Sequence, residues 1–161
     1  MSELDQKLLD HFLNPRNVGV IENPSGFGRA LNPVNQYLTD MYLQVKDGRI
    51  EDIKFKTFGC VVTIASASAL TTKVKGKILG EIVDHQDSLK ILLELIHQEL
   101  GVVPENNWHC PPAAVQALLV AFCDYYQKIN DERRVRQVEK TLKDVQCYFQ
   151  DGKRKMNVTK K

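Results

Sequence analysis

The chain has 161 residues, which at ~150 residues per domain predicts a single domain and excludes a large multidomain enzyme. Lys and Arg (22) nearly balance Asp and Glu (20), four cysteines are present, and 43% of the residues are hydrophobic. A chain of this size buries roughly 70% of its unfolded surface, so it needs no disulfide or structural metal. The apolar runs are short and the first residues are charged, so we expect a soluble cytoplasmic protein without membrane association.

Hydrophobic periodicity and turn residues predict an order of elements along the chain. The Asp47-Gly48 pair predicts a tight hairpin, and Pro111-Pro112 predicts the first turn of a helix. Ser2 is the expected cap of the first helix. The expected elements are a helix at about residues 3–13, strands near 27–31, 41–45 and 53–57, and helices at about 62–74, 88–100, 111–128 and 131–149.

This order predicts an α+β fold in which a small antiparallel three-stranded sheet packs against helices, with an extra C-terminal helix. We divide the chain into a domain at 1–130 and a basic extension at 131–161, whose last residues, 150–161, we expect to be disordered. The extension carries ten basic and five acidic residues, net +5, whereas residues 1–130 are net −3. No nucleic-acid motif accompanies this charge, so a nucleic-acid partner is not expected. A solvated helix is the expected role of the extension, and a docking element is the alternative.

The cysteines differ in their surroundings. Cys60 and Cys110 each precede a predicted helix, where the helix dipole favours a thiolate, and His109 adjoins Cys110. Thiolate and imidazole ligands suit zinc or iron. Cys123 and Cys147 lie within predicted helices and read as ordinary thiols.

Two other pairs could suggest acid–base or hydrolytic chemistry. Ser66 and Ser68 alternate with alanine and lack a G-x-S-x-G elbow, so they indicate close helix packing. Asp10-His11 has no nucleophile nearby in sequence, which favours a structural role.

Several ordered motifs carry a family resemblance. They are DHFLNPRNVG at 10–19, FKTFGC at 55–60, IASAS at 64–68 and the His109-Cys110 pair, at consistent separations. Together they resemble the IscU/NifU N-terminal family of iron–sulfur cluster assembly scaffolds. The resemblance implies a non-enzymatic protein that accepts sulfur from a cysteine desulfurase and holds iron or a transient [2Fe-2S] cluster.

The resemblance also implies roles for individual residues. Cys110 corresponds to the leading sulfur acceptor, with Cys60 as the second, and Cys60, His109 and Cys110 correspond to metal ligands. Asn35 stands where the family has its first cysteine, and Tyr37 stands where it has an aspartate. An asparagine amide cannot replace a thiolate on soft iron, and a tyrosine would have to lose a proton to bind. The expected ligand set is therefore degenerate at these two positions.

These departures leave alternatives open. One is a regulatory or adaptor paralogue that docks on the assembly machinery but builds no cluster, and another is a small zinc-binding protein that uses the same three residues. The family often carries Leu-Pro-Pro-Val-Lys before its His-Cys pair, read by an Hsp70-type chaperone, whereas this chain has VPENN at 103–107, which disfavours that partner. The sequence leaves open whether two copies form a homodimer.

Overall fold

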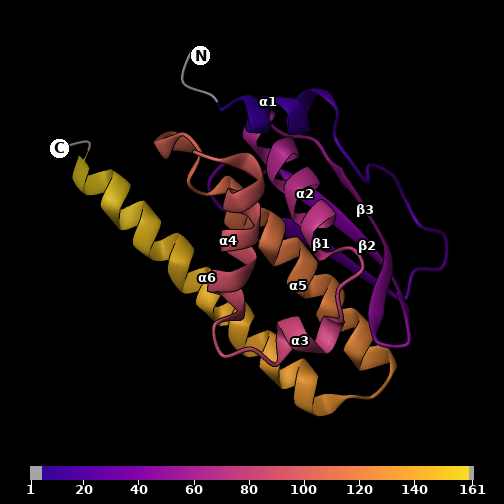
Figure 1. The fold of residues 1–161 in the computed structure, drawn as a ribbon. Helices are drawn as coiled ribbons and strands as arrows, with labels where there is room; N and C mark the ends of the chain where they lie inside the picture. The colour runs from indigo at the N-terminus through magenta and orange to yellow at the C-terminus, as the bar shows by residue number, and fades with distance from the viewer. Residues whose placement is uncertain (1–4, 160–161) are drawn as a thin grey trace.

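The computed structural model describes residues 5–159, with side chains described as far as Lys155, and contains one antiparallel sheet packed against six α-helices (Figure 1). The elements are α1 (Gln6–Leu13), β1 (Gly26–Leu31), β2 (Leu38–Lys46), β3 (Arg49–Thr57), α2 (Val61–Val74), α3 (Leu79–Val83), α4 (Ser88–Leu100), the 3₁₀ turn η1 (Glu105–Asn107), α5 (Cys110–Lys128) and α6 (Glu132–Thr159). The predicted α+β architecture and its three strands are confirmed.

The sheet has the strand order β1-β2-β3, with both neighbouring pairs antiparallel. Asp47 and Gly48 connect β2 to β3, and both have positive φ angles (52° and 74°). A two-residue turn with two positive φ angles matches the twist of the flanking strands, which explains why this dipeptide closes the hairpin.

Helices α2 and α5 cover one face of the sheet, and α4 and α6 pack on the outer side of those helices (Figure 1). The contact between β1 and α5 is unusually close, because a Cβ at Gly28 would lie 2.3 Å from the Ala117 carbonyl oxygen. The alanines that α2 contributes to the core are fully buried, as the small-residue pattern predicts. This packing fixes the starts of α2 and α5, where the candidate cysteines stand.

Helix α1 begins at Gln6, three residues later than the sequence predicts. Asp5 is its cap, since the Asp5 carboxylate accepts a hydrogen bond from the Lys7 N–H at 2.8 Å. Ser2, the expected cap, lies outside the described residues. The short elements α3 and η1 are not predicted from the sequence.

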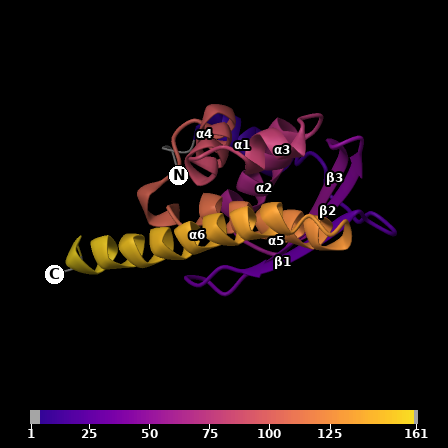
Figure 2. The same ribbon diagram turned by 90° about the horizontal axis from the view of Figure 1, so that it is seen from below.

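Helix α6 runs alongside α5 and extends beyond the rest of the molecule (Figure 2). It continues to Thr159, so the predicted end near residue 149 and the predicted disorder from residue 150 are wrong within the described residues. Val138, Val145 and Phe149 bury the inner side of α6, and Gly152 packs on Trp108, so tertiary contact extends the helix past its last apolar repeat. The division of the chain at residue 130 stays a prediction.

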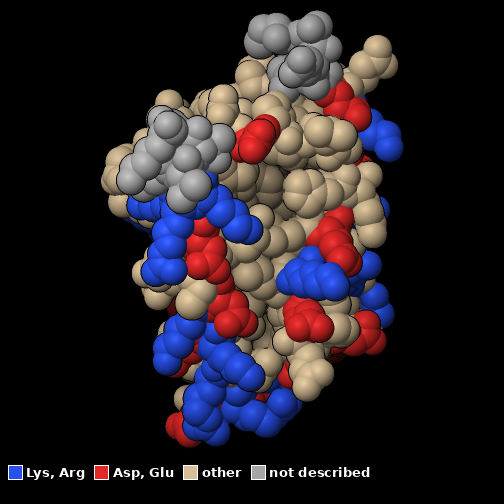
Figure 3. Space-filling model, turned by 90° about the vertical axis from the view of Figure 1, so that its left-hand side faces the viewer, with Lys and Arg blue, Asp and Glu red and all other residues tan. Residues whose placement is uncertain are grey.

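The outer face of α6 is charged. In the view of Figure 3, Lys and Arg side chains follow this helix in a band with Asp and Glu interspersed. Near its start, Arg134 forms ion pairs with Asp84 at 3.0 Å and with Asp131 at 3.4 Å. No helix in the described part of the chain has the length and apolar character that crossing a membrane requires.

Candidate functional site

The starts of α2 and α5 bring two cysteines into contact. Cys60 occupies the N-cap position of α2, three residues after the end of β3, and Cys110 is the first residue of α5. Their Sγ atoms are 3.9 Å apart. Cys60 is half-buried, whereas Cys110 is only 1% exposed. The two cysteines that the resemblance implies as metal ligands are therefore in contact, with Cys60 on the solvent side of the pair.

Two polar side chains that the sequence analysis missed surround the sulfur atoms. The Thr63 hydroxyl lies 3.3 Å from Cys60 Sγ and 3.5 Å from Cys110 Sγ. The Asn107 amide donates toward the same two sulfurs, at 3.8 and 4.0 Å. The signal for Thr63 is its position three residues after a helix-capping residue, where a side chain points back to the cap. No local signal identifies Asn107, because η1 brings it to the site.

The two thiols are not equivalent. The hydrogen bond from Cys110 lowers the pKa of the Cys60 thiol to about 4, against the opposing effect of burial, and the Thr63 hydroxyl and the first N–H groups of α2 act in the same direction. The same hydrogen bond and the burial of Cys110 raise the pKa of the Cys110 thiol. We therefore assign the negative charge to Cys60 and the shared proton to Cys110.

His109 joins the site through its ring. It is 7% exposed, and its Nδ1 atom lies 3.8 Å from Cys110 Sγ and 3.0 Å from the Asn32 amide nitrogen. Since the Asn32 side-chain nitrogen can only donate, and the Asn32 side-chain oxygen accepts from the Val34 N–H, His109 Nδ1 is the acceptor and its lone pair is already engaged. Burial lowers the pKa of His109, partly offset by the charge on Cys60, so the imidazole is neutral. Asn32 is a further site residue that the sequence did not indicate.

Asn35 and Tyr37 lie in the loop between β1 and β2, at the same end of the sheet. Asn32 ties the start of this loop to His109, and the Thr57 hydroxyl donates to the Leu38 carbonyl at its end. The Asn35 side-chain oxygen Oδ1 accepts from the Tyr37 N–H at 3.1 Å, and the Tyr37 side chain is 41% exposed. Within residues 5–159 neither side chain hydrogen-bonds to the thiols or to His109. The five predicted site residues share one end of the fold, but only three of them are in contact.

The remaining candidates lie elsewhere. Cys123 is half-buried on α5, where burial raises the pKa of its thiol, and Cys147 is exposed on α6. His11 Nδ1 lies 2.8 Å from the Ser68 hydroxyl, but Ser68 is fully buried and also accepts from the Arg16 N–H. This contact holds α1 on α2, which agrees with the structural role expected for these residues.

The donor set has the chemistry for iron but is incomplete for a closed site. Two thiolates on one tetrahedral metal ion, each with a bond of about 2.3 Å, place their sulfurs about 3.8 Å apart. The observed separation of 3.9 Å between the Sγ atoms of Cys60 and Cys110 matches this value. Among residues 5–159, however, no three His, Cys, Asp or Glu side chains are arranged as a metal site. Two ligands are preorganised, and any further ligand requires movement of His109 or a group from outside this set.

Comparison with known proteins places the chain in a family. The family model for the NifU-like N terminal domain matches residues 3–132. The chain belongs to this family. Two relatives are named iron–sulfur cluster assembly scaffold proteins. IscU 1 of Archaeoglobus fulgidus is 42% identical over 142 residues, covering 87% of this chain and 89% of its own length. IscU of Aquifex aeolicus is 38% identical over 151 residues, covering 92% and 88%.

A solved structure shares the fold. A protein from Fervidobacterium islandicum, described as an iron–sulfur cluster assembly scaffold for the SUF system, aligns with a TM-score of 0.56 at 17% identity, over 73% of this chain and 94% of that one. The resemblance to the IscU/NifU N-terminal family, inferred from the motifs, is confirmed. Nearly all of α6 lies beyond the residues that the family model matches.

Proposed function

We propose that this chain is a scaffold on which iron and sulfide assemble into a transient [2Fe-2S] cluster, with Cys60 and Cys110 as the principal ligands. The observation that carries the proposal is the preorganised thiol pair, whose Sγ atoms are already at the spacing of two ligands on one metal ion. Relatives at 38–42% identity over most of the chain are named cluster assembly scaffolds, which supports the same role here. The cluster is cargo, and no substrate is turned over by the chain itself.

Sulfur delivery is the first step of this function, and a cysteine desulfurase is the proposed donor. The sequence favours Cys110 as the first acceptor, but the burial of Cys110 supports Cys60 instead, with Cys110 behind it. The Cys60 thiolate attacks the outer sulfur of the donor's persulfide, forming a new S–S bond while the donor's S–S bond breaks. The inner sulfur, which belongs to the desulfurase's cysteine, leaves as a thiolate. One sulfur atom is therefore transferred to Cys60 without net oxidation or reduction.

The surface beside Cys60 suits docking of the donor. Phe58, two residues before Cys60, is 79% exposed, and Leu38, whose carbonyl accepts from the Thr57 hydroxyl, is 47% exposed. Exposed apolar side chains around a polar centre are typical of a protein interaction surface. We propose that the desulfurase contacts this apolar rim when it presents its persulfide to Cys60.

Asn35 and Tyr37, which stand where the family has a cysteine and an aspartate, determine how long a cluster stays bound. A neutral amide at Asn35 and a phenol at Tyr37 do not supply the thiolate and carboxylate that would complete the coordination. His109 becomes available as a third ligand only when its Nδ1 leaves the Asn32 amide. The proposed scaffold therefore holds its cluster weakly, as a carrier that must release it requires. Zinc suits the same thiol pair, so the metal that binds has to be measured.

The test is anaerobic incubation of the full chain with ferrous iron, cysteine and a cysteine desulfurase. A thiol reductant is added after the persulfide has been sampled, because conversion of the persulfide's outer sulfur to sulfide takes two electrons. We expect a persulfide on Cys60 by mass spectrometry, followed by a visible chromophore that contains equal amounts of iron and acid-labile sulfide. Cys60→Ser is expected to abolish both products, whereas Cys123→Ser, a matched change outside the site, leaves them intact. Persulfide on Cys147 alone, or zinc without sulfide, contradicts the proposal.

A further inference from the structure

Trp108 connects the thiol site to the C-terminal helix. It immediately precedes His109, and the two rings meet edge to face with centroids 5.6 Å apart and an interplanar angle of 87°. On α6, Tyr148 and Phe149 lie 6.3 and 6.1 Å from the Trp108 ring. The indole therefore contacts the site through one neighbour and α6 through two.

Gly152 allows the close approach of α6 to this indole. A Cβ at Gly152 would lie 2.2 Å from Trp108 Cζ3 and 2.4 Å from Cη2, and neither ring atom is the end of a flexible chain. Glycine is disfavoured in a helix interior relative to alanine. Its presence in α6 is explained by the contact with Trp108, because every larger residue would displace either the ring or the helix.

A second contact joins α6 to the other side of the site. Lys153 donates a hydrogen bond to the Pro33 carbonyl at 3.3 Å. Pro33 follows Asn32, whose amide donates to His109. Helix α6 thus touches both segments that meet at His109, the β1–β2 loop and the turn before α5.

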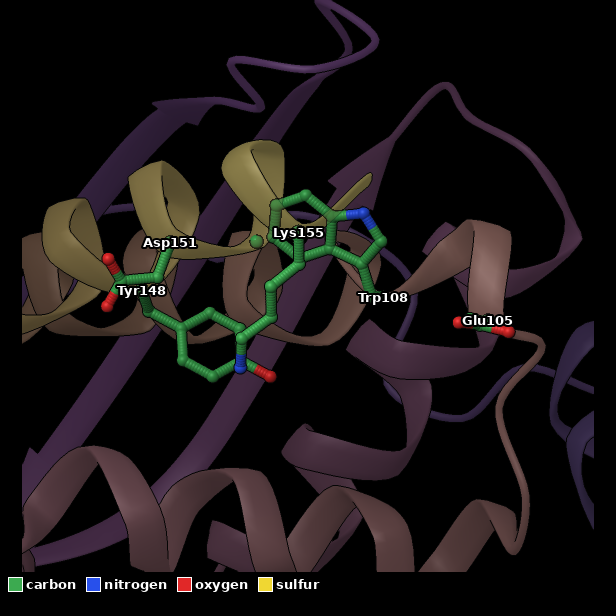
Figure 4. A pocket seen from close by; sticks show the side chains of 6 residues that line it. Glu105, Trp108, Tyr148, Asp151 and Lys155 are labelled. Atoms are coloured by element: carbon green, nitrogen blue, oxygen red, sulfur yellow. The ribbon is translucent and has the colours of Figure 1, made fainter. Parts of the chain in front are cut away.

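There is room beside the indole for it to move. A cavity of about 280 Å³ adjoins Trp108 and is lined by Glu105 on η1 and by Tyr148, Asp151 and Lys155 on α6 (Figure 4). The ring is therefore held by its contacts with α6 and not by close packing on all sides. Loss of those contacts would release the turn that carries Asn107 and His109.

We propose that Trp108 is a positioning residue through which α6 holds the turn at 107–109 over Cys110. With α6 docked, Asn107 and His109 cover the inner thiol, and only Cys60 is open to a reactant. When the contact between Trp108 and α6 is broken, the turn shifts and Cys110 becomes accessible. The functional meaning of this control, release of the inner ligand during cluster assembly or transfer, rests on the proposed function.

The test is a brief alkylation of the metal-free full chain with iodoacetamide, read for each cysteine by peptide mass spectrometry. In the parent, Cys110 is expected to be protected, while Cys147, which is exposed, provides the internal reference. Gly152→Ala and Tyr148→Ala are each expected to increase labelling of Cys110 by about two- to tenfold. This is the change in an equilibrium that one strained rotamer, in Gly152→Ala, or one lost aromatic contact, in Tyr148→Ala, produces. Tyr148 is 38% exposed, so its truncation leaves the core intact.

Two further variants separate positioning from general loosening. Trp108→Phe removes the outer part of the indole that the alanine Cβ in Gly152→Ala would overlap. The double variant, Trp108→Phe with Gly152→Ala, is therefore expected to regain protection of Cys110. Val138→Ala cuts a buried α6 contact away from Trp108 and is expected to lower stability without exposing Cys110. Unchanged labelling of Cys110 in both Gly152→Ala and Tyr148→Ala, or an equal increase in Val138→Ala, overturns the proposal.

The alkylation experiment and the cluster assay can refute the positioning role and the proposed function separately. Labelling uses neither iron nor sulfide, so a chain that assembles no cluster can still show protection of Cys110 that depends on Trp108. In that case the proposed function fails and the positioning role stands. Conversely, if the parent assembles clusters while labelling of Cys110 is the same in the parent and in every α6 variant, the positioning role alone is refuted.

Discussion

Replacement of Thr63 by valine tests whether the thiolate at Cys60 is stabilised as the structure indicates. Valine has nearly the shape of threonine, and Thr63 is 4% exposed, so the change removes the hydroxyl and little else. That hydroxyl lies 3.3 Å from Cys60 Sγ and 3.5 Å from Cys110 Sγ. Its single hydrogen points at one sulfur at a time, and the charged Cys60 is the stronger acceptor.

The size of the effect follows from this geometry. A hydrogen bond to a charged group contributes about 1.5–3 kcal/mol, and we take the lower end because the contact is shared between two sulfurs. One pKa unit corresponds to about 1.4 kcal/mol, so the pKa of Cys60 should rise by about one unit from its value of about 4. The thiolate fraction at pH 4.5 then falls about threefold, whereas at pH 7 it is unchanged.

The assay is the rate of Cys60 alkylation between pH 3 and pH 7, with the fold checked by circular dichroism at each pH. The matched control is Thr71→Val on the same helix, because the Thr71 hydroxyl donates to the Ala67 carbonyl at 2.9 Å and not to a sulfur. The midpoint should move in Thr63→Val and stay in place in Thr71→Val. If both variants keep the parent's midpoint, the assigned role of Thr63 is refuted.

Three further predictions concern the ligands, the pH dependence and the core. The double change Asn35→Cys with Tyr37→Asp should increase the iron and sulfide retained after desalting, and an unchanged yield would show that these positions do not limit assembly. Burial lowers the pKa of His11 and of His109 below about 6.5, the unfolded value, and the pKa of Cys60 is lowered too, so the unfolded state binds more protons and the free energy of unfolding should fall as pH drops from 7.5 to 5.5; a flat profile in urea melts contradicts this. Gly28→Ala should cost about 1–3 kcal/mol in the same melts, because its Cβ would strike the Ala117 carbonyl, and a cost near zero would refute the close approach of β1 and α5.

Local sequence signals predicted much of the fold because they act within a few residues. The Asp47-Gly48 turn fixed the hairpin, and Pro111-Pro112 marked the start of α5. The end of α6 was missed for the opposite reason. Gly152 resembles a helix breaker when only its neighbours are considered, whereas its actual partner, Trp108, lies more than forty residues earlier and contributes the contact that extends the helix.

The candidate site was predictable only in part. Cys60 and Cys110 stood out because each precedes a helix, and both occupy one site. Their inequality was not predictable, since burial of one thiol and exposure of the other depend on how α2 and α5 pack. Asn32 bonds to a ring 77 residues away, and no periodicity or spacing in the sequence reports such a contact. The two cysteines were therefore predictable from the sequence, whereas the side chains that contact them were found only in the structure.

Native mass spectrometry of the full chain after anaerobic loading with iron and sulfide shows whether Cys60 and Cys110 hold a cluster. A scaffold that holds its cluster on this thiol pair should give a species heavier by two iron and two sulfide per cluster, in the monomer or shared by two copies. This species should be lost when Cys60 and Cys110 are both changed to serine and kept when Cys123 and Cys147 are both changed. Cluster retained without Cys60 and Cys110, or only zinc bound to the parent, would contradict the assignment of the thiol pair as the scaffold's ligands.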